Sequence, residues 1–184
     1  MSEATAEKIV LAVDTSTDML ACAVGRLGEE GVELLASGDH LCRRHANEEL
    51  VTTCLDVLGR AGLAMADVDA VLVGRGPGSF TGLRIGIAAV KGLAWAADKP
   101  CFGVSTLEAM AQNLAHMDGL LVCAMDARRN QVYNALFEAK NGVLTRLTPD
   151  RAIAVAELAE ELRGETLSPA VLLPGENGGI ILAG

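Results

Sequence analysis

Hydrophobic and polar positions divide the beginning of the chain into three apolar runs separated by short polar turns. The stretch 7–16 is apolar up to Asp14, the run 19–28 follows almost at once, and the run 32–41 returns after a turn at 28–31. Short apolar runs bounded by such turns are typical of strands. The pattern predicts a three-stranded antiparallel meander.

A helical period replaces the strand pattern after the meander. We expect a helix over 48–61, with Asn47 as its N-cap and Gly62 just past its end, because both residue types favour helix termini. The apolar run 68–74 then predicts a buried strand, and a glycine-rich loop leads into a second helix over 83–97. This half of the chain therefore combines a small sheet with two helices.

The same order of elements begins again in the second half of the chain. An apolar run ends in Asp126, as the first run ends in Asp14, and the pair Asn141-Gly142 is typical of a hairpin turn. The predicted strands of this half lie at 119–126, 130–139, 143–148 and 169–174, and the predicted amphipathic helix lies at 153–164. Two such copies predict an internal duplication. The segments that should superpose are 8–40 with 68–74 on 120–147 with 169–174.

The duplication defines the expected fold and domains. We predict a duplicated α/β fold with two lobes, each a mixed β-sheet with flanking helices, over 1–103 and 104–184. A linking helix over about 105–117 opens the second lobe, and Ser105 and Glu108 have the spacing of a capping box. The second copy stops where the first enters its last helix, so we expect the second lobe to be incomplete at its C-terminus.

Composition and charge limit the classes of function. The 184 residues carry a formal net charge of −9, which argues against a stand-alone nucleic-acid binder because clustered Lys and Arg hold phosphate backbones. The cysteines form no CxxC pair, and Cys22 and Cys123 lie inside apolar strands, as expected of reduced core thiols. Neither a leader nor a bilayer-spanning apolar run is evident, so we expect a cytoplasmic protein without membrane contact. The hydrophobic share of 51% predicts that part of the surface meets a partner.

The stretch GRGPGSFTGLRIG, residues 74–86, raises the question of phosphate binding. It matches neither GxxxxGK[ST] nor GxGxxG, and Pro77 removes a backbone N–H that a phosphate-binding loop would use. Positive φ angles in a tight turn explain the glycines better, with Ser79 or Thr81 as the cap of the following helix. We therefore expect the loop to deliver its helix to a partner.

Both helices of the first lobe are more apolar than packing on one sheet requires. In the helix over 83–97 the charged residues Arg84, Lys91 and Asp98 fall on one stripe, and small residues four apart elsewhere let a second helix approach closely. The two helices can simply pack on each other, but their lack of polar positions favours a partner surface. The predicted interface residues are Leu50, Val51, Cys54, Leu55, Leu58, Ile85, Ala88, Ala89, Gly92 and Ala96.

Five stretches together resemble the bacterial TsaB (YeaZ) family across nearly the whole chain. They are VDTSTDMLACAV, HANEELV, DAVLVGRGPGSFTGLRIGIAAVKGLAWA, GVSTLEAMA and MDARRNQVYNALFE. The resemblance implies the duplicated actin-like ATPase (ASKHA) fold and a non-catalytic subunit of the complex that forms N6-threonylcarbamoyladenosine in tRNAs reading ANN codons. It also implies that the two helices contact the catalytic paralogue TsaD, that the ATPase TsaE joins them, and that tRNA is met only through the complex. A homodimer is expected when the chain is alone.

The resemblance also relates the first turn to a phosphate site. Asp14, Thr15 and Ser16 match the phosphate-facing hairpin of ASKHA enzymes. In the second copy, however, ARRN follows Asp126 where hydroxyls and glycines would be needed. A nucleotide site built from both lobes would be half present, so we interpret the hairpin as vestigial and expect no cofactor.

Catalysis by the chain itself is the alternative function. A stand-alone ASKHA-type ATPase or kinase would need a working second phosphate loop, and a metallopeptidase-like enzyme would need a metal cluster. His45 is followed four residues on by Glu49, and His40 and His116 have no liganding neighbours in the sequence. Because zinc and iron sites need three or four ligands, we expect neither a metal site nor catalytic residues.

Overall fold

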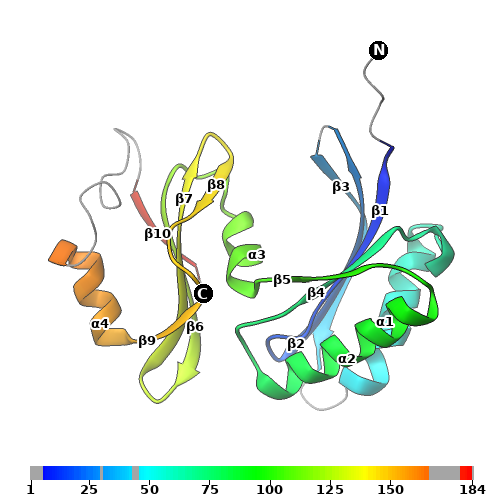
Figure 1. Ribbon diagram of the computed structural model, residues 1–184, viewed down its shortest axis with the longest axis horizontal. Helices are drawn as coiled ribbons and strands as arrows, with labels where there is room; N and C mark the ends of the chain where they lie inside the picture. Colours follow the sequence, from blue (N-terminus) through cyan, green and yellow to red (C-terminus); the bar gives the residue numbers. More distant parts are fainter. Residues whose placement is uncertain (1–5, 30, 43–45, 166–178, 184) are drawn as a thin grey trace. The chain divides into compact units, whose positions relative to one another are not determined.

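The computed structural model describes residues 6–29, 31–42, 46–165 and 179–183. The chain divides into two units, Met1–Val104 and Ser105–Gly184, and each unit contains its own five-stranded sheet (Figure 1). The predicted strand at 169–174 lies outside the described residues. Within those residues, no helix combines the length and apolar character needed to cross a bilayer.

The sheet of the first unit confirms the predicted meander. Its strands lie in the order β3-β2-β1-β4-β5, with the first three antiparallel and the last two parallel to β1. Their bounds are β1 Lys8–Asp14, β2 Met19–Gly28, β3 Gly31–Leu41, β4 Ala70–Gly74 and β5 Cys101–Val104. Strand β5 was not predicted, because a run of four residues is too short to show an alternation of its own.

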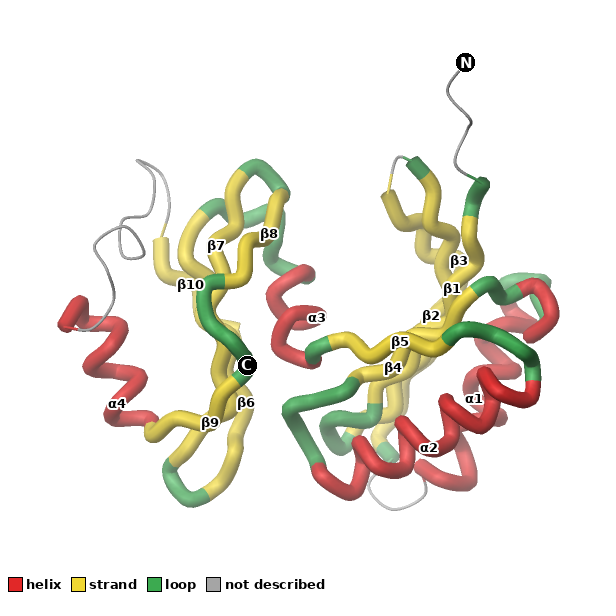
Figure 2. The backbone as a smooth tube through the Cα atoms, in the orientation of Figure 1, coloured by secondary structure: helices red, strands yellow, loops and turns green. Residues whose placement is uncertain are grey.

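Two helices, α1 (Ala46–Arg60) and α2 (Phe80–Ala96), pack on one face of this sheet (Figure 2). Alternate residues of β1, such as Leu11 and Val13, point to that face, as the period of a strand requires. Asn47 lies inside α1 and is not its N-cap, because the helix begins at Ala46. A short 3₁₀ turn, Met65–Asp67, connects α1 to β4.

The sheet of the second unit has the order β10-β6-β7-β8, with β9 paired to β7. The strands are β6 Gly119–Arg128, β7 Gln131–Lys140, β8 Val143–Arg146, β9 Arg151–Ala154 and β10 Gly179–Ala183. The hairpin at Asn141-Gly142 has the two positive φ angles, 53° and 77°, of the expected turn. Residues 153 and 154 were predicted as the start of the helix but belong to β9. Strand β8 pairs with only the last residues of β7 and leaves its first half open for pairing.

Helices cover both faces of the second sheet (Figure 1). Helix α3 (Thr106–Gln112) packs against Leu121 and Cys123, while Leu158 of α4 (Val155–Glu160) packs with Leu120 and Val122. The first seven residues of β6, 119–125, therefore form an unbroken apolar run, as expected of a strand segment buried on both faces. A π-helical segment, Glu161–Glu165, follows α4.

Helix α3 is shorter than the predicted linking helix over 105–117. After Gln112 the chain tightens into i to i+3 turns, such as the 2.9 Å bond from Leu114 N–H to the Ala111 carbonyl. Ser105 caps the helix as expected and accepts from Glu108 N–H at 3.2 Å. The Glu108 carboxylate instead accepts from Arg146, at 2.9 Å, so only half of the capping box forms.

The two sheets share one topology, which confirms the predicted duplication. In each, the first strand lies between an antiparallel second strand and a parallel later strand: β1 between β2 and β4, and β6 between β7 and β10. The place of β4 is thus taken in the second copy by Gly179–Ala183, a later segment than the predicted 169–174.

Candidate functional site

The glycine-rich loop packs directly against the turn that joins β1 to β2. Glycines 74, 78, 82 and 86 recur every four residues, and a Cβ atom at any of them would overlap atoms of the turn formed by Asp14, Thr15 and Ser16. Gly76 and Gly78 also have positive φ angles, of 96° and 159°. The glycines therefore serve two needs, left-handed backbone in the loop and close backbone contact with the turn. The spacing of four residues between these glycines can be seen in the sequence, and it is the signal that could have predicted their contact with the turn.

Helix α2 begins where the loop ends. Of the two predicted caps, Ser79 and Thr81, the N-cap is Ser79, whose hydroxyl accepts from Gly82 N–H at 3.3 Å. The Ser79 N–H donates to the Ser16 carbonyl at 2.6 Å. The start of α2 is thus fixed to the β1–β2 turn by backbone and side chain together.

The groups of the predicted vestigial hairpin are engaged within the protein. The Thr15 hydroxyl donates to the Gly82 carbonyl at 2.8 Å, and the Ser16 N–H and hydroxyl both donate to Asp14 Oδ1, at 2.9 and 2.6 Å. Thr15 and Ser16 are buried. In the second copy Asp126 Oδ1 accepts from Arg128 N–H at 2.7 Å, which is the same local turn without the hydroxyls. The Thr15 hydroxyl therefore ties the turn to α2, and the Ser16 hydroxyl stabilises the turn itself.

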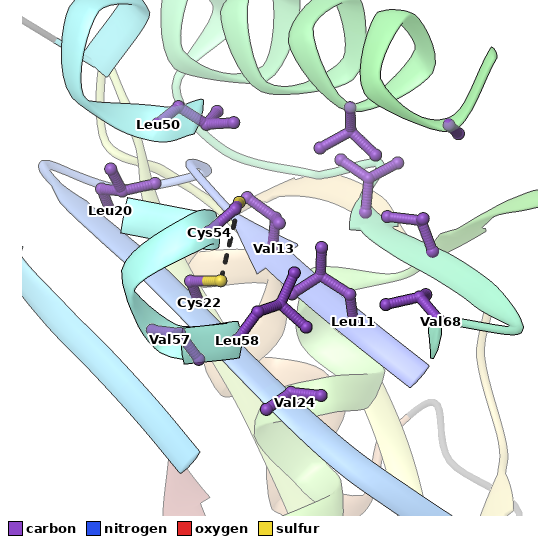
Figure 3. Close-up of a cluster of buried hydrophobic side chains, with 14 residues drawn as sticks. Leu11, Val13, Leu20, Cys22, Val24, Leu50, Cys54, Val57, Leu58 and Val68 are labelled. Carbon is purple, nitrogen blue, oxygen red and sulfur yellow. Dashed lines mark hydrogen bonds between the residues drawn. The ribbon is translucent and has the colours of Figure 1, made fainter. Parts of the chain in front are cut away.

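Three of the five predicted interface residues on α1 belong to the core instead. Leu50, Cys54 and Leu58 are buried and pack with Leu11 and Val24 (Figure 3). The prediction was wrong for these three because α1 lies over the sheet with its i, i+4 and i+8 positions inward, and the apolar arc alone does not show how much of it the sheet covers. Val51 and Leu55 are exposed, at 40% and 52%.

On α2 three of the four predicted small residues point away from the core, and the fourth, Ala89, packs partly against it. Ala88, Gly92 and Ala96 are exposed, Ile85 and Ala89 are half-buried, and a Cβ atom built at Gly92 meets nothing within 4 Å. The buried positions of this helix are Gly86, Val90 and Ala94. The partner face that the structure leaves uncovered, called here the helix-pair face, consists of Val51, Leu55, Phe80, Ile85, Ala88, Ala89, Gly92, Trp95 and Ala96.

Two aromatic side chains of the helix-pair face were not predicted. Phe80 is 74% exposed and Trp95 is 86% exposed. Arg84 lies over the Phe80 ring, 5.4 Å from its centroid, and both line a surface hollow of about 540 Å³ together with Ile85 and Ala88. Placing Trp95 on the helical wheel beside Ala88 and Gly92 would have found it. Large exposed aromatics beside small residues are typical of surfaces that bind another protein.

The cysteines of the described residues differ in their surroundings. The Cys22 thiol donates to the Cys54 sulfur at 3.6 Å in the core, as the dashed line in Figure 3 marks. This hydrogen bond and burial raise the pKa of Cys22, and the same bond lowers the pKa of Cys54. Burial raises the pKa of Cys123 to about 11. Cys22 and Cys123 are core thiols, as predicted.

The expectation that His40 has no liganding neighbour is corrected by the fold. Its imidazole lies beside Cys42 and Glu49, and one donor atom from each of the three side chains lies within 4.8 Å of the others. Glu49 comes from α1, so spacing along the sequence does not show this group. His45 lies outside the described residues.

Comparison with known proteins finds relatives that agree with one another in name and in fold. A family model described as TsaD, tRNA N6-adenosine threonylcarbamoyltransferase, matches residues 40–170. The tRNA threonylcarbamoyladenosine biosynthesis protein TsaB of Bacillus subtilis is 37% identical over 84% of this chain and 66% of its own length. The Escherichia coli protein of the same name is 39% identical over 73% of this chain and 57% of its own. The structure of YeaZ from Pseudomonas aeruginosa is 30% identical, with a TM-score of 0.71, and the match covers 96% of this chain and 75% of that one. The chain thus spans less than two thirds of either curated relative.

Proposed function

The chain belongs to the TsaB (YeaZ) family, and from this membership we propose that it is a non-catalytic subunit in the formation of N6-threonylcarbamoyladenosine in tRNA. Its two sheets of equal topology form the duplicated actin-like α/β fold. The relatives' names place those proteins in this biosynthesis. A role as a binding subunit would explain both the fold and the exposed helix-pair face.

The observation that carries the proposal is the helix-pair face. Figure 1 shows α1 and α2 side by side on the first sheet, and their outer sides expose Leu55, Phe80 and Trp95. Leaving such apolar area in water is unfavourable by about 25 cal/mol per Å². A partner that covers it would recover that free energy, and the small residues Ala88 and Gly92 would allow its helices to come close.

The partner we assign to this face is the catalytic paralogue TsaD, with the ATPase TsaE joining the pair. Without TsaD, a second copy of the chain would cover the face through a two-fold self-contact. The net charge of −9 disfavours direct binding of a phosphate backbone, so tRNA, of the class that reads ANN codons, would be met through the complex. The cytoplasmic location stays a prediction.

The hydrogen bonds of the β1–β2 turn support a non-catalytic role. A stand-alone ATPase or kinase would use hydroxyls of this turn on the nucleotide phosphates. Here the Thr15 hydroxyl donates to the Gly82 carbonyl and the Ser16 hydroxyl to Asp14. Using the Thr15 hydroxyl on a phosphate would break its contact with the start of α2, and using the Ser16 hydroxyl would break the bond that stabilises the turn.

A reconstituted reaction tests the proposal. TsaD, TsaE, substrate tRNA, ATP and a preformed activated threonylcarbamoyl donor would be combined with and without the chain, and modified adenosine would be quantified by mass spectrometry. We expect modification only when the chain is present, and equal activity when Thr15→Val removes the hydroxyl while keeping the shape. Full activity without the chain would overturn the proposed role. Activity of a folded Thr15→Val protein reduced to the level without the chain would instead favour a chemical role for the turn.

A further inference from the structure

Three side chains of different chemistry converge between β3 and α1. His40 lies near the end of β3 and Cys42 two residues on, so both point to the same side of the extended chain. The Cys42 N–H donates to the Asp18 carbonyl at 2.8 Å, which holds this end of the chain beside the start of β2. Glu49 stands in the first turn of α1 and faces them.

The donor atoms meet at the Glu49 carboxylate. His40 Nε2 lies 2.7 Å and Cys42 Sγ 3.2 Å from Glu49 Oε2. The Cys42 thiol donates its hydrogen to this oxygen. The three groups therefore already aim their lone pairs or protons at a common point.

We propose that His40, Cys42 and Glu49 form a binding site for a divalent metal ion of the zinc class. Imidazole nitrogen, thiolate sulfur and carboxylate oxygen are the three donor types that zinc takes in proteins. Around a tetrahedral zinc ion, with metal–donor distances of 2.0–2.3 Å, these atoms stand about 3.4–3.6 Å apart. To reach this geometry, the His40 and Cys42 donor atoms would each move away from Glu49 Oε2 by less than about 1 Å. Their own separation is at most 4.8 Å and would settle at the same value.

The surroundings of the three side chains allow an ion to enter, and they leave room for a water molecule to complete its coordination shell. The His40 and Glu49 side chains are 39% and 46% exposed. His40 also lines a surface hollow of about 390 Å³ between β3 and α1, together with Asp39 and the ion pair of Asp56 with Arg60. Binding replaces the thiol proton of Cys42 by the metal and releases it to solvent, so charge and atoms balance without another reactant. A water molecule takes the fourth position.

The competing explanation is a hydrogen-bonded clamp that merely ties β3 to α1. The two differ in what the thiol does, because a clamp needs the S–H proton and a metal site needs the thiolate. Cobalt(II) distinguishes them, since a cobalt–thiolate bond gives a near-ultraviolet charge-transfer band that nitrogen and oxygen ligands do not give. The inference is independent of the proposed partner role.

The test uses the full chain freed of metal by a chelator and titrated with cobalt(II) and then with zinc(II) alone. We expect one cobalt ion per chain with a thiolate band, displacement by zinc, and a raised melting temperature with zinc. Cys42→Ser should abolish the band, and His40→Gln and Glu49→Gln should each weaken zinc binding by about tenfold or more, since even indirect contacts to a metal are worth about 10–100-fold.

Cys101→Ser and His116→Gln are the matched controls, because they remove the same donor types at other positions and should leave binding unchanged. If the wild-type chain binds no cobalt, or if Cys42→Ser keeps the thiolate band, the site is refuted. Equal zinc affinity in the wild-type and Glu49→Gln proteins would refute it as well, and this variant keeps the size of the side chain should Cys42→Ser fail to fold.

Discussion

At the scale of single residues, the loop glycines differ in what surrounds them. A Cβ atom at Gly82 would overlap the Thr15 carbonyl oxygen, whereas one at Gly92, on the same helix, would meet open space. The phosphate question raised by the sequence thus has a structural answer, because most of these glycines make room for the β1–β2 turn. Their conformational freedom is required only at Gly76 and Gly78.

Alanine at these two helix positions should have opposite effects. Gly82→Ala should lower the free energy of unfolding by about 1–3 kcal/mol, because overpacking forces the turn away from α2. Gly92→Ala should raise it by about 0.5–1 kcal/mol, the usual gain when alanine replaces glycine in a helix. Urea denaturation of both variants measures the difference. Equal stability of the two variants would show that Gly82 does not contact the turn.

Asp69 gives a pH dependence whose sign can be stated. Its carboxylate accepts from Ile9 N–H at 2.8 Å, and this hydrogen bond, with lesser help from Lys8, lowers the pKa of Asp69 below its ordinary 3.8. A carboxyl whose pKa is lower in the folded state stabilises the fold above its unfolded pKa and loses that contribution as pH falls through the folded value.

Asp69→Asn should therefore be less stable than the wild type at pH 7, and the difference in melting temperature should shrink as the solution is acidified below pH 3.8. Glu138→Gln, an exposed acid on β7, is the control and should show little difference at either pH. A difference for Asp69→Asn that stays constant on acidification would contradict the assigned cause.

At the scale of elements, β9 and the segment after α4 are joined to β7 by one arginine. Arg151 donates to the buried Asn134 Oδ1 through Nε and Nη2, at 3.1 and 3.0 Å, and to Glu161 Oε2 at 2.7 Å. The Asn134 amide in turn donates to the Cys123 carbonyl on β6, at 2.9 Å. Four elements of the second unit thus depend on one polar network.

Arg151→Met should lower the free energy of unfolding by about 1–3 kcal/mol, the range for buried polar groups left without a partner. Arg26→Met, which removes the exposed ion pairs with Glu7 and Glu33, should lower it by less than about 1 kcal/mol. Adding Glu161→Gln to Arg151→Met should restore part of the loss. Similar losses for the two arginine variants would show that the network contributes no more than a surface pair.

Whether an element could be predicted depended on its length and on whether it forms only by pairing with a neighbouring strand. Long alternating runs such as β2, and caps such as Ser79, carry their signal locally and were predicted correctly. The four-residue strands β5 and β9 exist because a neighbouring strand offers free backbone groups, and this is a tertiary condition. The group around His40 needed the packing of α1 on β3 and was missed for the same reason.

At the scale of the molecule, two copies of one topology differ in how their helices are placed. In the first unit α1 and α2 share a face of the sheet and keep an apolar outer side, whereas in the second unit α3 and α4 lie on opposite faces. The periodicity of the sequence predicted that α1 and α2 are more apolar than packing on one sheet requires. It did not predict which side of α1 the sheet covers. Some of the predicted interface residues are therefore buried in the core, and the others are exposed on the surface.

The central claim is that the helix-pair face binds TsaD, and affinity measured by titration of TsaD tests it most directly. Gly92→Leu adds bulk where nothing lies within 4 Å, so the variant should fold, as circular dichroism would verify. Overpacking of about 1–3 kcal/mol predicts a loss of affinity of about 5–150-fold, with a parallel loss of self-association. The matched variant Ala156→Leu, on the exposed side of α4, should bind like the wild type. Wild-type affinity for TsaD in a folded Gly92→Leu protein would contradict the claim.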